Sequence, residues 1–296
     1  MDNDSEKQFI EILRTENPDY VSANKLLKSK VNINSEINLL YEVLVECPEN
    51  NMLDIIRFFL NNGYDVGKKK GQFGSECIRS ILFKTKDSRE IEAVKLMLDA
   101  GVVNVKEDDG ETLLEYIEGC FGDGELIYDD YKGDTSLDNI LSVIYEMILA
   151  CEEGRDYHNI QHANNIEGRQ ISHIYAVRKD KKNIFFDVDV HDSKHNNCFR
   201  TDLYFETSQG FLIISEYLDA WFDKTMPTSR IEDVTEKFKG IIGRTVNKYK
   251  SYQNTINGHT SMGMNLMMDN GKILRFASNF GETNEEEFMV SYFEII

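Results

Sequence analysis

Along the first half of the chain, apolar residues recur every three or four positions, as they do on one face of an amphipathic helix. This spacing predicts four consecutive helix pairs: residues 5–15 with 19–29, 36–47 with 51–62, 74–86 with 88–100, and 111–121 with 136–153. Gly63 and Gly101 follow the second helix of two pairs. A glycine at that point ends a helix because it adopts a left-handed conformation at little cost.

The pairs also resemble one another in sequence. Gly101 lies 38 residues after Gly63, and Lys30 occupies the corresponding place 33 residues before Gly63. Residues 90–114 run from a helix through Gly101, a short Val-Asn-Val segment and the Asp109-Gly110 turn to Thr112, where the next apolar run begins. That order of elements resembles the ankyrin-repeat family, although the Pro and His of its Thr-Pro-Leu-His signature are replaced here. The resemblance implies a helical solenoid that presents its fingers and concave face to protein partners.

From about residue 168 the apolar spacing changes to two residues, which is the period of a β-strand. Strands are predicted at 170–177, 183–191, 200–207, 211–215, 244–252, 264–268, 273–277 and 288–293, with a hairpin signal at Asn270-Gly271. Helices are predicted at 217–222 and at 229–238, the second opened by a capping box. The sequence therefore predicts a multidomain chain: ankyrin-like repeats over 1–153, a linker over 154–167, and an α+β domain with an antiparallel sheet over 168–296.

Charge and composition narrow the classes of partner. The 296-residue chain has a net charge of −19, and residues 1–154 hold 32 acidic residues against 16 basic ones. This acidity argues against a nucleic-acid partner and favours a basic protein partner, although solubility alone is the other explanation. The acidic N-terminus and the lack of an 18-residue apolar run predict a soluble, cytoplasmic protein without a membrane partner. Five scattered cysteines without a CxxC pair indicate a reducing compartment.

The acidic residues concentrate around an insertion at 122–135, inside the last helix pair. Residues 107–138 hold twelve acidic residues and one base, Lys132, and the insertion itself holds two tyrosines, Tyr128 and Tyr131. Insertions in solenoids form loops on one face, often the binding face. The predicted protein-binding residues are Tyr64, Asp108, Asp109, Glu111, Tyr116, Asp123, Tyr128, Asp129, Asp130, Tyr131 and Asp134.

The sequence contains few residues in patterns typical of catalytic or metal-binding sites. The chain has no phosphate-binding loop, nucleophile elbow or HExxH motif. His191, His195 and Cys198, with Asp187 and Asp189 on the preceding strand, have side chains of the types that bind zinc or iron. A polar strand face that ends in a hairpin explains them more simply, so no catalytic residue, metal or cofactor is predicted.

Two classes of function stay open. The first is a non-catalytic protein-interaction module, in its sharper form an immunity or antitoxin-like inhibitor of a basic partner such as a nuclease-type toxin. The second is an enzyme or ligand-binding protein whose site lies in the sheet domain, with the repeats recruiting its substrate. The oligomeric state does not follow from the sequence.

Overall fold

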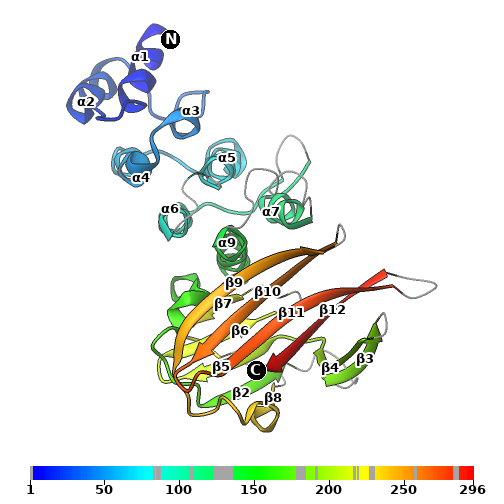
Figure 1. The fold of residues 1–296 in the computed structure, drawn as a ribbon. Coiled ribbons are helices and arrows are strands. Elements are labelled where there is room, and N and C mark those ends of the chain that lie inside the picture. The colour runs from blue at the N-terminus through cyan, green and yellow to red at the C-terminus, as the bar shows by residue number, and fades with distance from the viewer. Residues whose placement is uncertain are drawn as a thin grey trace. The chain divides into compact units, whose positions relative to one another are not determined.

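The chain is described from a computed structural model, which covers residues 3–82, 84, 88–106, 110–122, 136–177, 185–190, 193–215, 218, 220–226, 231–256, 259–282 and 287–296. It divides into two compact units (Figure 1). Unit 1 comprises Met1–Asp129 and Ile144–His158, and unit 2 comprises Asp130–Val143 and Asn159–Ile296. The helices lie in the first half of the chain and the antiparallel sheets in the second, as the apolar spacing predicts.

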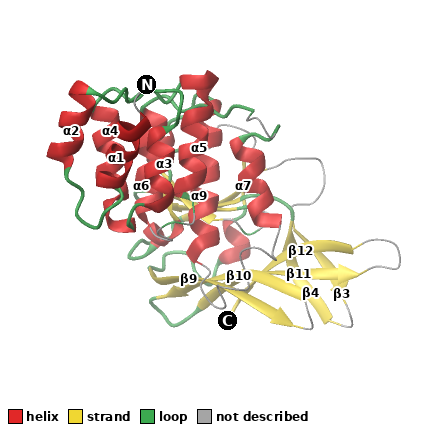
Figure 2. Ribbon diagram, turned by 90° about the horizontal axis from the view of Figure 1, so that it is seen from above, coloured by secondary structure: helices red, strands yellow, loops and turns green. Residues whose placement is uncertain are grey.

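The helices coincide with the predicted pairs to within a few residues. They are α1 (Asn3–Leu13), α2 (Tyr20–Ser29), α3 (Leu39–Glu46), α4 (Met52–Asn61), α5 (Gln72–Ile81), α6 (Ser88–Asp99), α7 (Leu113–Gly122) and α9 (Ser136–Glu152). The first three pairs pack internally, α1 on α2, α3 on α4 and α5 on α6. Neighbouring pairs also pack on one another, because α3 contacts both α1 and α5, while α4 contacts α6. Figure 2 shows these helices side by side.

The second helix of every pair ends with the same backbone hydrogen bond. A residue just past the helix donates its N–H to a carbonyl five residues earlier, which is the bond of a Schellman cap. The four bonds are Val31 to Leu26 (2.9 Å), Tyr64 to Phe59 (3.1 Å), Val102 to Met97 (3.1 Å) and Arg155 to Ala150 (2.8 Å). The residue before the donor is Lys30, Gly63, Gly101 or Gly154, and the three glycines have positive φ angles.

Unit 2 contains two antiparallel six-stranded sheets. The first has the strand order β1-β7-β6-β5-β2-β8, from β1 (Gln161–His162), β7 (Ala220–Asp223), β6 (Gly210–Ile214), β5 (Leu203–Thr207), β2 (His173–Val177) and β8 (Ile231–Asp233). The second has the order β3-β4-β12-β11-β10-β9, from β3 (Phe185–Val190), β4 (Ser193–Phe199), β12 (Glu287–Ile295), β11 (Ile273–Glu282), β10 (His259–Met268) and β9 (Val246–Ile256).

One hydrophobic core joins the two sheets. Alternate residues of the strands point into it, for example Leu203 and Phe205 from β5 and Leu274 and Phe276 from β11. The Phe205 and Phe276 rings meet edge to face at 5.8 Å between centroids. Phe238, at the end of a short 3₁₀ helix (Thr235–Phe238), stacks on a ring of β12 within the same core. The core therefore fixes the register of both sheets.

Some elements of unit 2 differ from the prediction. Trp221 lies in strand β7 rather than in a helix, and the helix predicted over 229–238 is replaced by strand β8 and the short 3₁₀ helix. The stretch predicted as a linker, 154–167, includes Ile160, Ala163 and Ile166, all fully buried. Apolar residues at close spacing satisfy a strand or a 3₁₀ turn as well as a helix, so the pattern alone did not separate these cases.

Candidate functional site

The outward faces of α3, α5 and α7 border a groove of about 650 Å³ on unit 1. We call it the helical groove, and the residues that line it are Glu36, Ile37, Asn38, Tyr41, Glu42, Val45, Lys69, Phe73, Glu76, Arg79, Ser80 and Tyr116. The first helix of three successive pairs contributes to one continuous surface. A groove shared by several repeated elements is suited to hold an extended or helical segment of another protein.

The helical groove follows from the amphipathic pattern of its helices. In α3 the core side is formed by Leu39, Leu40, Val43 and Leu44. Tyr41, Glu42 and Val45 occupy the opposite side and line the groove. In α5 the core side includes Cys77, Ile78 and Ile81, while Glu76, Arg79 and Ser80 line the groove. The side chains that line the groove are therefore those that are not packed in the core.

A buried polar network lies beneath the groove. The Asn38 side-chain amide donates to the Phe73 carbonyl at 2.9 Å and to Glu76 Oε2 at 2.8 Å. The Tyr64 hydroxyl donates to Asn38 Oδ1 at 2.5 Å and lies 3.5 Å from Cys77 Sγ. Burial raises the pKa of Tyr64 and raises the pKa of the Cys77 thiol to about 12. Both groups therefore stay neutral at physiological pH, and the network links α3 to α5 without burying a charge pair.

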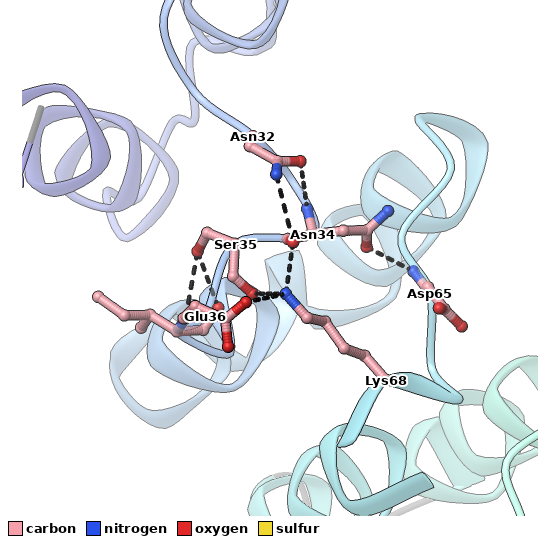
Figure 3. Close-up of polar contacts among 7 residues, drawn as sticks. Asn32, Asn34, Ser35, Glu36, Asp65 and Lys68 are labelled. Atoms are coloured by element: carbon pink, nitrogen blue, oxygen red, sulfur yellow. Dashed lines mark hydrogen bonds and ion pairs between the residues drawn. The ribbon is translucent and has the colours of Figure 1, made fainter. Parts of the chain in front are cut away.

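A second polar network joins the loop before α3 to the loop before α5, and Figure 3 shows it in close-up. The Asn34 side chain accepts from the Asp65 backbone N–H at 2.8 Å. The Lys68 ammonium donates to the carbonyls of Asn34 and Ser35 and forms a 3.3 Å ion pair with Glu36. These contacts connect successive helix pairs at the end of the groove where Glu36 lies.

The basic residues of the groove already have partners within the chain. Arg79 Nη2 lies 3.4 Å from Glu111 Oε2, and the guanidinium carbon lies 4.3 Å from the centroid of the Tyr116 ring. The Lys69 ammonium lies 5.0 Å from the centroid of the Phe73 ring. A guanidinium or ammonium placed over an aromatic face is attracted by the ring quadrupole. Two of the groove's carboxylates are paired as well, Glu36 with Lys68 and Glu42 with Arg14. Among the described lining residues, Glu76 is therefore the carboxylate without a basic partner.

The structure places three of the residues predicted to bind protein. Tyr116 lines the helical groove, and Glu111 is the ion-pair partner of Arg79 beside it. Tyr64 is only 6% exposed, because its hydroxyl is used in the buried network, so it contributes to stability rather than to a surface. The remaining residues lie outside the described part of the chain, namely Asp108, Asp109, Asp123, Tyr128, Asp129, Asp130, Tyr131 and Asp134.

Sequence reasoning did not identify Tyr41, Glu42, Glu76 or Arg79 as site residues. Their signal was present, since each occupies the polar face of a predicted amphipathic helix. Such a face is usually only solvated, and nothing in the sequence separates it from a binding surface until α3 and α5 are placed side by side.

The candidate metal ligands of the second half lie only partly within the described residues. Cys198 lies fully buried in β4. Asp187 and Asp189 belong to β3 and His195 to β4, whereas His191 lies outside the described residues. Across the part of the chain that the structure describes, no three His, Cys, Asp or Glu residues are grouped closely enough to hold a metal ion.

Unit 2 also has a polar cluster on β2 and β5, centred on Glu206. Glu206 Oε2 accepts from the Ser172 hydroxyl at 3.2 Å and the Tyr175 hydroxyl at 3.3 Å, and it lies 3.0 Å from His173 Nδ1. The serine and the histidine both contact the carboxylate instead of each other. Nucleophilic catalysis requires the base to contact the nucleophile, so this arrangement is that of a surface hydrogen-bond network.

Comparison with known proteins adds no assignment: no protein-family model, curated protein or solved structure matches the chain. Within the described residues, none of the helices is both long enough and apolar enough to span a bilayer. The helical groove and the distribution of charge are the features of the chain that bear on its function.

Proposed function

We propose that the chain is a non-catalytic protein-binding module whose helical unit is a short ankyrin-like solenoid that binds a basic protein. The observation that carries the proposal is the helical groove, lined by three successive helix pairs. The solenoid interpretation is supported by the repeated cap, which recurs at intervals close to the ankyrin period of about 33 residues in the first three pairs. In such arrays the stacked helices form a rigid concave surface.

Charge indicates the class of partner. The chain has a net charge of −19, and acidic residues outnumber basic ones two to one in residues 1–154. A negative surface of this kind accelerates encounter with a positive protein and disfavours nucleic acid. In its sharper form the proposal is an immunity or antitoxin-like inhibitor of a nuclease-type toxin, because a protein that holds nucleic acid is itself basic.

The proposal is tested with a tagged full-length chain used to isolate its partner from the source cells. The purified pair is then measured by titration calorimetry and by hydrogen exchange. We expect a binary complex with a basic partner, an affinity that falls with salt, and exchange protection in α3, α5 and α7. Protection confined to unit 2, or a partner that is acidic, would contradict the proposal.

A further inference from the structure

The carboxylate of Glu76 is held in the helical groove by a buried amide. Asn38, which is 6% exposed, donates to Glu76 Oε2 at 2.8 Å and at the same time caps α3 by accepting from the Tyr41 N–H at 3.1 Å. The Tyr64 hydroxyl fixes the other side of the Asn38 amide at 2.5 Å. Because the Asn38 amide is held on both sides, it orients one carboxylate oxygen of Glu76 from within the protein.

The second oxygen of that carboxylate is available. Among the residues that the structure describes, Glu76 Oε1 has no hydrogen-bond partner, and neither has the Tyr41 hydroxyl on the same groove surface. Glu76 is partly buried, so a cation that reaches it binds where water screens the interaction less than at an open surface. A carboxylate held in one orientation also loses less freedom on binding, which increases affinity.

The surroundings of Glu76 favour a ligand that carries a positive charge next to an apolar group. Arg79 and Lys69 are engaged with Glu111, Tyr116 and Phe73, so they compete little for the carboxylate. Apolar side chains of the groove remain exposed nearby: Ile37 is 43% exposed and Val45 is 49% exposed. A cationic side chain with an apolar neighbour complements both features.

From this geometry we propose that Glu76 is the anchor for one lysine or arginine of the basic partner, within a segment whose neighbouring apolar side chain packs against Val45 and Ile37. This inference rests on the proposed function and specifies the chemistry of the bound segment. A second copy of this chain fits poorly, since two molecules of charge −19 repel one another. Nucleic acid fits poorly too, because its phosphates would face the glutamates.

The experiment presents a random library of 12-residue peptides to the full-length chain by phage display. Glu76→Gln is the test variant, since its amide carbonyl still accepts from Asn38 and only the charge is removed. Glu11→Gln is the matched control: it makes the same change at an exposed position of α1, outside the groove. Thermal unfolding of all three proteins verifies that they are folded.

We expect the wild type and Glu11→Gln to enrich peptides that carry lysine or arginine beside an apolar residue. For a selected peptide, Glu76→Gln should lower the affinity about tenfold or more, the usual effect of losing a charged hydrogen bond. Glu11→Gln should change it by less than about twofold. The decrease in affinity between 50 and 300 mM salt should be smaller for Glu76→Gln than for the wild type.

Other outcomes overturn the inference in distinguishable ways. If the enriched peptides lacked basic residues, or if Glu76→Gln enriched the same peptides equally well, Glu76 would not be the anchor. The groove would still be a protein-binding surface. Failure of the wild type to enrich any peptide would count against both the anchor and the groove as a binding surface.

Discussion

The Tyr64 hydroxyl shows how one buried polar atom connects two helix pairs. It follows the Gly63 cap of one pair and donates to Asn38, which caps the first helix of that pair and bonds to the next pair through Phe73 and Glu76. Tyr64 therefore connects the end of helix α4 to the packing of one helix pair on the next. Tyr64 is predicted from the sequence to bind a protein partner, but its hydroxyl has this internal role instead.

Replacing Tyr64 by phenylalanine should destabilise the protein by about 1–2 kcal/mol, because Asn38 loses a buried hydrogen-bond donor. Urea unfolding followed by circular dichroism at 222 nm measures the change. The matched control is Tyr41→Phe in the groove, where the hydroxyl has no hydrogen-bond partner among the described residues. That control should change stability by less than about 0.5 kcal/mol. Equal effects of the two variants would show that the Tyr64–Asn38 bond contributes little.

The buried Cys77 thiol should cause the protein to lose stability at alkaline pH. Burial raises the pKa of its thiol from 9.0 to about 12, so above pH 9 the unfolded chain loses the proton while the folded chain keeps it. The unfolded state then binds fewer protons, and the free energy of unfolding falls as pH rises, by up to about 1.4 kcal/mol per pH unit. Comparing urea midpoints at pH 8 and pH 10.5 under reducing conditions should give a smaller pH effect for Cys77→Ala than for the wild type.

At the scale of elements, two glycines of the first unit, Gly101 and Gly119, affect helix stability in opposite ways. Replacing each by alanine should show this. Gly101 has a φ of +96° in the α6 cap, and an added Cβ would meet nothing within 4 Å. Gly119 lies exposed within α7, again with nothing within 4 Å and without a positive φ. Gly101→Ala should therefore destabilise the protein by about 1 kcal/mol through conformation alone. Gly119→Ala should stabilise it by about 0.5–1 kcal/mol by favouring the helix.

Thermal unfolding of the two alanine variants in parallel measures the difference. The chemical change is identical and neither site involves a clash. Opposite shifts in the melting temperature would therefore come from the backbone conformation at each site. Two shifts of the same sign would mean that the left-handed cap does not control the stability of this helix end.

The helix limits could be predicted because the signals that set them are local. Asn38 and Thr112 begin helices and Gly63 and Gly101 end them, each by contacts within a few residues. Strand β4 was missed because its sequence, SKHNNCF, has no apolar alternation, and it is held by pairing with the adjacent β3 and with β12, which lies more than 90 residues later. The groove was missed for a similar reason, since Asn38 and Glu76 come together only when the pairs stack.

At the scale of the whole molecule, the net charge of −19 should control how quickly a basic partner is captured. Changing Asp123, Asp129, Asp130 and Asp134 to asparagine removes four negative charges from the insertion between α7 and α9. The association rate with a basic partner should fall about tenfold at low salt, with little change in dissociation. Stopped-flow mixing at two salt concentrations measures both rates. If the affinity and its salt dependence do not change, the insertion is not part of the binding surface.

The ammonium group of Lys68, enclosed by two backbone carbonyls and Glu36, also has a consequence for chemical reactivity. An amine must be free of other contacts to attack an acylating reagent, and the Lys68 amine is occupied by these three acceptors. Lys70, two residues along, is exposed. Limited acetylation of the folded protein should modify Lys70 well before Lys68, so the ratio of the two products reports whether the loops before α3 and α5 are joined.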